Sequence, residues 1–237
     1  MGPWLLIVCA FFSSALAAVL GLGGGVLLIS LMPGLIPNAA VVPVHGVVQW
    51  ASNLSRAALA WREITWKPLG SFALGAAIGA AVGSRWVVVL PDGWLPVLLG
   101  LFILFVTWAP WLRSIRWPGR FVTVGGVQTF VSLFVGAAGP LISPLLLREG
   151  FGRDRIVATH GAMMSVLHGL KTATFVVLGF EFLAYGPLMA GMIVAATLGS
   201  WAGTRLRGRL SEKRFRKAFK VLLTLLALRL VLPALLG

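Results

Sequence analysis

Charge, and acidic charge above all, is scarce in this sequence. Only 11% of the 237 residues are charged and six are acidic, whereas a soluble globular domain carries about 25% charged residues. The composition therefore excludes an ordinary soluble protein. With 59% hydrophobic residues and a mean hydropathy of +0.96, it also excludes a disordered chain, which requires low hydrophobicity.

Chemically reactive groups are also few. Cys9 is the one cysteine, so no disulfide can form within the chain, and we expect neither redox chemistry nor a metal-thiolate cluster. The sequence contains no nucleotide-binding loop, no H-E-x-x-H motif and no Ser/His/Asp set. We therefore expect no enzyme activity, no cofactor and no metal.

Long apolar runs are what the sequence has instead. A helix needs about 20 apolar residues to cross a bilayer core of about 30 Å, so we expect an all-α polytopic membrane protein with roughly seven to nine segments. We expect a single domain, 1–237, in contact with the lipid bilayer. The runs lie at about 4–20, 24–31, 39–61, 68–90, 94–112, 121–135, 140–147, 156–180, 182–204 and 218–236.

The net charge of +14 comes from 20 Lys and Arg residues against six acidic residues. The basic residues lie mostly in short loops between the apolar runs, as is typical of cytoplasmic loops that face anionic lipid. We therefore expect no nucleic-acid partner. Ala15-Leu16-Ala17 resembles a signal-peptidase site, but no Lys or Arg precedes the first apolar run, so we expect a retained membrane segment.

The chain contains an internal repeat. Runs 24–31 and 140–147 are too short to span a bilayer, and each follows a glycine break, at Gly21–Gly25 and at Gly136–Pro140. A shift of 115 residues places Gly21 on Gly136, Gly24 on Gly139, His45-Gly46 on His160-Gly161, Asn53 on His168, and Arg56 on Lys171. We interpret this as two homologous repeats of about four hydrophobic segments each, at about 1–112 and 118–237.

The loop charges predict that the two repeats are inverted. Every pair of corresponding loops differs in its Lys and Arg content, as expected if the halves face opposite sides of the membrane. Inversion follows if each repeat begins with a helical hairpin broken at its glycines. Fifteen loop cations are then cytoplasmic against Arg85 outside, and both termini lie outside the inner membrane. If all eight segments crossed, the cations would divide eleven to five, and 4–20 is long enough to cross alone.

The glycine breaks and the ionisable residues within the runs define a candidate site. A half-helix that begins at a break presents unpaired N–H groups and a positive dipole end, which suit an anion. The alternatives are that the glycines serve only packing, that the histidines are interhelical hydrogen-bond donors, and that Arg56 snorkels to the interface. The candidate substrate-binding residues are Gly23, Gly24, Gly25, His45, Asn53, Arg56, Gln128, Gly139, Pro140, His160, His168 and Lys171.

Small residues recur at four-residue intervals in both halves, a spacing that lets helix backbones approach closely. We interpret these stripes as packing surfaces, either within the monomer or between the subunits of a homodimer. The stripes are Gly75, Gly79 and Gly83 in the first half, and Gly191, Ala195, Gly199 and Gly203 in the second.

The duplicated unit, the Gly21–Gly25 cluster, its partner Gly136-x-x-Gly139-Pro140 and the two His-Gly pairs resemble the TauE/SafE sulfite exporter family of membrane permeases. The resemblance implies transport of sulfite, sulfonates or related sulfur-containing anions across the bacterial inner membrane. From the residues alone we expect a secondary transporter of a small anion, driven by the anion gradient or coupled to a proton carried by histidine. The alternatives are a membrane-embedded scaffold or accessory subunit, and an anion channel.

Overall fold

The structure, a computed structural model, describes residues 2–20, 23–87, 94–109, 119–137, 139–206 and 212–236. In these ranges every regular element is a helix, apart from an isolated bridge between Pro33 and Ile36. The predicted all-α class is therefore confirmed for the described residues. The α-helices are α1 (Leu5–Leu20), α2 (Gly24–Leu31), α3 (Asn38–Leu59), α4 (Trp66–Ser84), α5 (Trp94–Trp108), α6 (Phe121–Val135), α7 (Ser143–Arg148), α8 (Arg153–Val177), α9 (Gly186–Leu206) and α10 (Glu212–Leu236), with 3₁₀ turns η1 (Trp61–Glu63), η3 (Gly139–Leu141) and η4 (Phe182–Tyr185).

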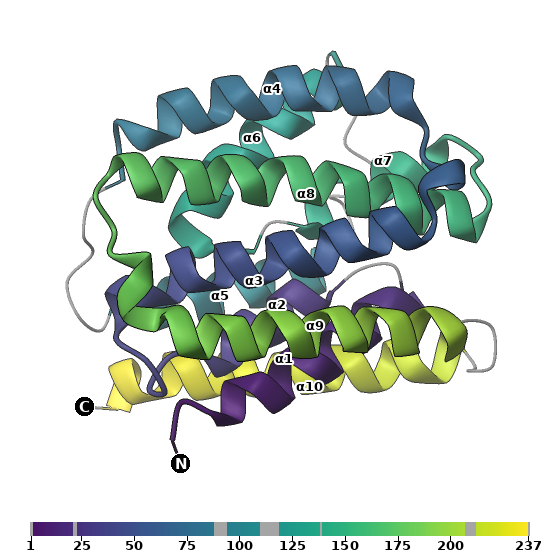
Figure 1. Cartoon of the computed structure of the whole chain (residues 1–237). Coiled ribbons are helices and arrows are strands. Elements are labelled where there is room, and N and C mark those ends of the chain that lie inside the picture. Colours follow the sequence, from purple (N-terminus) through teal and green to yellow (C-terminus); the bar gives the residue numbers. More distant parts are fainter. Residues whose placement is uncertain are drawn as a thin grey trace.

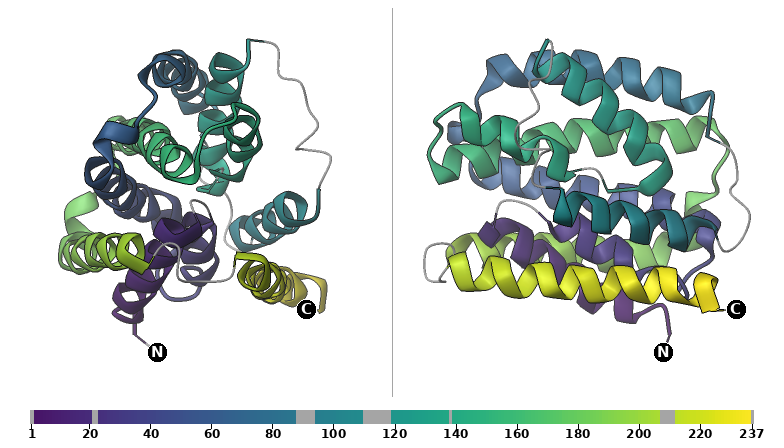
Figure 2. Two further views of the ribbon diagram at one scale, coloured as in Figure 1. Left: turned by 90° about the vertical axis from the view of Figure 1, so that its right-hand side faces the viewer. Right: turned by 180° about the vertical axis from the view of Figure 1, so that it is seen from behind.

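The long helices run roughly side by side along one axis, as Figure 1 shows and as the end-on view in Figure 2 makes plain. The two chain ends, marked N and C, lie at the same end of this bundle, which we call the terminus end. Helix α3 begins at the terminus end and runs to the opposite end, where η1 leads into α4 (Figure 1). We call this opposite end the η1 end.

One helical segment in the described ranges, Phe182–Leu206, is by length and composition able to cross a membrane. Three further apolar helices, α1, α5 and α6, are shorter. Helices α3 and α8 are 22 and 25 residues long, but each carries histidine and a cation within its length. Helix length alone does not test the expected number of membrane crossings, which stays a prediction.

The helices of the two halves pack across each other. Helix α1 packs against α9, and α4 packs against α6. If the two halves are repeats as predicted, α1 corresponds to α6 and α4 to α9, so both halves make the same contact with the roles exchanged. Under the same correspondence, α3 with α8 and α5 with α10 each join a helix to its counterpart, and the contact of α3 with α9 matches that of α8 with α4.

The small-residue stripes form the α4–α6 and α1–α9 contacts. A methyl group added at Gly79 would lie 2.9 Å from the backbone carbonyl carbon of Gly126, and one added at Gly203 would lie 2.8 Å from that of Ala15. These helices therefore touch backbone to backbone, as glycine permits. Because the chain's own helices cover both stripes, a homodimer would need a different surface.

Both glycine segments interrupt a helix. Helix α1 ends at Leu20 and α2 begins at Gly24, after Gly23 with a left-handed φ of 93°. A methyl group at Gly24 would meet the carbonyl oxygen of Ser13, because α2 packs back against α1. Helix α6 ends before Gly136, whose φ of 69° is also left-handed. In each case only glycine adopts the backbone without strain.

Candidate functional site

Helices α3 and α8 meet at their His-Gly pairs. A methyl group at Gly46 would lie 2.9 Å from Cε of Lys171, and one at Gly161 would lie 3.2 Å from the carbonyl oxygen of Asn53. Each of these glycines therefore makes room for the polar stretch of the opposite helix. The polar residues of the two halves meet at the centre of the bundle for this reason.

A small cavity of about 30 Å³, the central cavity, lies between the two glycine breaks. One water needs about 10–15 Å³ of such space, so this closed form has room for about two waters. A polyatomic anion would need the cavity to expand. Of the predicted residues, the cavity is lined by Gly23, Gly24, Gly25, Asn53, Arg56, Gly139, His160 and His168.

Arg56 lies on the cavity wall and is 3% exposed. Its Nη1 donates to the carbonyl oxygen of Ala17 at 3.0 Å, and its Nη2 donates to Oδ1 of Asn53. Ala17 is in the last turn of α1, where the helix dipole is negative and favours a cation. The alternative in which Arg56 snorkels to the interface is therefore wrong, because the guanidinium is held inside the bundle.

Lys171 is fully buried and connects the two breaks. Its Nζ donates to the carbonyl oxygen of Gly136 at 2.8 Å and to Nδ1 of His45 at 3.4 Å. The Nε2 of His45 in turn donates to the carbonyl oxygen of Gly25 at 2.9 Å. Helical spacing places Lys171 on the same face as His160 of its own helix, but its hydrogen bond is to the histidine of the other half.

Gln128, unlike most of the predicted residues, does not line the central cavity. Gln128 is buried in α6, and its Nε2 donates to Sδ of Met164 at 3.3 Å. Pro140 falls in η3, and its side chain is outside the described residues. Gln49, which the sequence analysis missed, lines the cavity. It lies four residues after His45 and four before Asn53, so helical spacing alone would have placed it on this face.

Several polar atoms at the cavity lack a partner. Among the described residues, Nε2 of Gln49, Nδ1 of His160 and Nδ1 of His168 are buried and make no hydrogen bond. Nε2 of His160 donates to the carbonyl oxygen of Gly139 at a long 3.4 Å. Buried polar atoms are nearly always paired, so this group is suited to hold a polar ligand.

The site has positive charge and no acidic residue near it in sequence. The stretches that build it, 1–62, 119–148 and 155–180, contain no Asp or Glu. Arg120 and Glu149 form an ion pair at 2.6 Å, and neither residue lines the central cavity. Within the described ranges no group of three or more His, Cys, Asp or Glu is placed to hold a metal. The arrangement can therefore stabilise a small anion, with donors from side chains and from the start of α2.

The chain has relatives among known proteins. The chain matches the family described as Sulfite exporter TauE/SafE over residues 6–230. It is 28% identical over 216 residues to the probable inner membrane transporter protein TsaS of Comamonas testosteroni, and the match covers 86% of each chain. No solved structure matches the chain. The resemblance based on the glycine clusters and His-Gly pairs is confirmed: this chain belongs to the TauE/SafE sulfite exporter family of membrane transporters.

Proposed function

We propose that this protein is a secondary transporter that exports a small sulfur oxyanion, sulfite or an organosulfonate, by alternating access around the central cavity. The observation that carries the proposal is the full burial of Lys171, which donates to a backbone carbonyl and to a histidine in stretches that contain no acidic residue. A buried charge is costly unless it is paired and hydrogen-bonded. Backbone carbonyls supply only partial negative charge, so an anionic substrate completes the balance.

The donors around the cavity suit an oxyanion. The oxygens of an oxyanion accept hydrogen bonds from several directions, and here the donors come from different helices. Arg56 and Gln49 come from α3, and the first N–H groups of α2 come from the glycine break at Gly23. With no carboxylate in the site stretches, a coupling proton would be carried by His45, His160 or His168.

The packing of the helices supports inverted repeats. The α1–α9 and α4–α6 contacts are equivalent under the repeat, as expected of two halves related by a pseudo-two-fold axis. Both chain ends lie at the terminus end, and α3 also begins there (Figure 1). This is the arrangement in which the first segment enters, breaks and returns. With the positive-inside count, we propose that the η1 end is cytoplasmic and the terminus end is outside.

The size of the central cavity supports alternating access. At about 30 Å³ the cavity is closed around space for water alone, so an anion enters only after part of the structure moves. Secondary transporters built from inverted repeats make this movement by rocking one unit against the other around a fixed site. A channel, in contrast, requires a continuous path.

The test is transport by the purified protein in proteoliposomes, over a panel of sulfite, sulfate, thiosulfate and sulfoacetate. We expect saturable uptake and counterflow for one of these anions, and selective thermal stabilisation by the same anion. At 100 times Kd the stabilisation is about 2.7 kcal/mol. Flux without counterflow would indicate a channel. The absence of both flux and selective stabilisation would indicate a scaffold or accessory subunit, and it would refute the proposal.

A further inference from the structure

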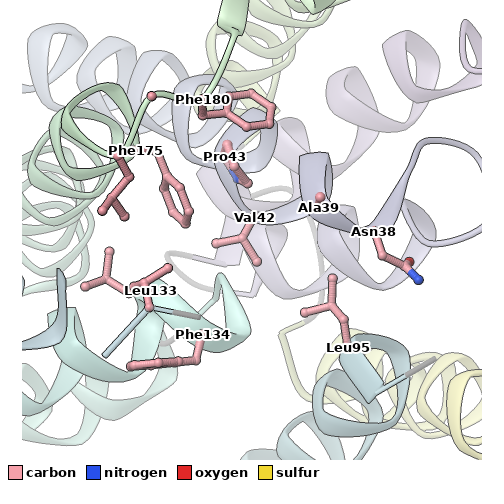
Figure 3. Close-up of a pocket in the computed structure, with 12 residues that line it drawn as sticks. Asn38, Ala39, Val42, Pro43, Leu95, Leu133, Phe134, Phe175 and Phe180 are labelled. Carbon is pink, nitrogen blue, oxygen red and sulfur yellow. The ribbon is translucent and has the colours of Figure 1, made fainter. Parts of the chain in front are cut away.

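Figure 3 shows a second and much larger pocket. It lies at the terminus end, because Asn38 and Ala39 at the start of α3 line it. Its volume is about 300 Å³, which is the lower limit for pockets that bind small molecules. Its wall is mostly apolar and comes from the starts of α3 and α5 and from the ends of α6 and α8. We call it the vestibule; Val42, Leu95, Leu133, Phe134, Phe175 and Phe180 line it.

One layer of residues separates the vestibule from the central cavity. On α3, Val42 lines the vestibule and Gln49 lines the cavity, and His45 lies between them along the helix. After α6, Ala137 lines the cavity, and Gly136 precedes it. A methyl group at Gly136 would lie 3.6 Å from Cγ2 of Val42, so Gly136 is close to the vestibule wall.

Helix α8 crosses the same layer in the opposite sense. His168 lines the cavity, Phe175 lines the vestibule, and Lys171 lies between them. The ammonium of Lys171 holds the layer together through its bonds to Gly136 and His45. The polar contacts of the layer thus connect α3, α8 and the end of α6.

We propose that His45, Lys171 and Gly136 form the gate between the vestibule and the central cavity, and that the anion opens it by competing with the Gly136 carbonyl for Lys171. This inference rests on the proposed function. A full negative charge attracts an ammonium more strongly than a carbonyl dipole does. When Lys171 turns to the anion, the break after α6 loses its hydrogen bond to α8. His45 acts as a positioning residue, because its bond to Gly25 fixes the ring that accepts from Lys171.

The opposite side of the central cavity offers a matched control. There Arg56 donates to Ala17, and Nη2 of Arg153 donates to the carbonyl oxygen of Val19 at 2.5 Å. These contacts connect α1 to α3 and α8 on the side of the cavity away from the vestibule. Arg153 does not line the cavity, so removing it deletes a cation on this side without touching the gate or the cavity wall.

The gate is tested by thiol accessibility in a Cys9→Ser background. Ala137→Cys places a reporter in the cavity wall, where the native residue is 5% exposed, and Ala39→Cys places a control in the vestibule. Each is combined with Lys171→Ala, Lys171→Met or Arg153→Ala. A small impermeant methanethiosulfonate is applied to intact cells and to inside-out vesicles. The preparation in which the Ala39→Cys thiol reacts identifies the vestibule side and is used for all rates.

We expect Lys171→Ala to raise the reaction rate of the Ala137→Cys thiol by about tenfold, as for the loss of a hydrogen bond to a charged group. Lys171→Met, which keeps most of the volume, should act in the same direction if the alanine variant does not fold. The Ala39→Cys rate should stay unchanged, and Arg153→Ala should leave both rates unchanged. Equal rates with and without Lys171, or an equal rise with Arg153→Ala, would overturn the gate.

The outcome is separable from that of the proposed function. If an anion stabilises the protein but the Ala137→Cys reaction rate does not depend on Lys171, the proposed function stands and the gate is refuted. If the rate depends on Lys171 but no anion stabilises the protein, Lys171 still closes the cavity and the assignment of an anionic substrate is refuted.

Discussion

Replacing Gly79 by alanine tests the helix packing on which the site depends. Gly79 lies in α4 against Gly126 of α6, and an added methyl carbon would lie 2.9 Å from the Gly126 Cα and closer to its carbonyl oxygen. Real side chains do not approach backbone this closely, so α4 and α6 would have to separate. Gly70, on the same helix, has no atom within 4 Å of an added methyl group and is the matched control.

The expected free energies of unfolding follow from two opposing terms. Alanine is favoured over glycine within a helix by about 1 kcal/mol, and overpacking costs about 1–3 kcal/mol. The clash partner at Gly79 is backbone, which cannot rotate away, so the upper value applies. Gly79→Ala should therefore lose about 2 kcal/mol, and Gly70→Ala should gain up to about 1 kcal/mol.

Thermal unfolding of the purified variants in one detergent measures the difference. For a chain of this length 1 kcal/mol corresponds to about 2–4 °C, so Gly79→Ala should melt about 4–8 °C below the unmodified protein. Gly70→Ala should melt at or above it. If both variants melted alike, α4 and α6 would not be in backbone contact, and the account of the stripes would be refuted.

The remaining predictions concern the site and the topology. Lys171→Met and Arg56→Met should each weaken anion binding by about 1–3 kcal/mol in a protein that still folds, measured by scintillation proximity; unchanged affinity in both would leave the site to helix N-termini. Gly24→Leu should abolish binding and flux, because its side chain would meet Ser13 and Ala17 and fill the break; normal flux would contradict this. After Cys9→Ser, an impermeant reagent should label Asn38→Cys but not Gly208→Cys in intact cells, although Gly208 lies outside the described residues; the reverse pattern would invert the topology.

The local features of the fold could be read from the sequence because they depend on neighbouring residues. The Gly21–Gly25 cluster predicts a helix break, and α2 begins at Gly24, where the first short apolar run was placed. Membership of the His-Gly pairs in long helices follows from apolar runs of sufficient length. The contact of Gly46 with Lys171, in contrast, depends on how α3 and α8 cross, and no spacing within one helix contains that information.

The site was predicted in part for the same reason. Comparison of the repeats selected residues that match in both halves, and Gln49 was missed because its counterpart, Met164, is apolar. Arg56 near a helix end suggested snorkelling, but the carbonyl of Ala17 and the amide of Asn53 hold it inside. These partners lie on another helix or one turn away. The position of the Ala17 carbonyl beside Arg56 depends on how α1 packs against α3, which the sequence of α3 does not contain.

The exchange of partners between the halves also sets the order in which the protein can assemble. Ala15 of α1 has its backbone contact with Gly203 of α9, near the other end of the chain. Ribosomes add about 5–20 residues per second, so α1 waits on the order of ten seconds or more for its partner. During that interval the face of α1 that will contact α9 lacks this partner. The first half of the chain is therefore a biosynthetic intermediate and not a module that matures on its own.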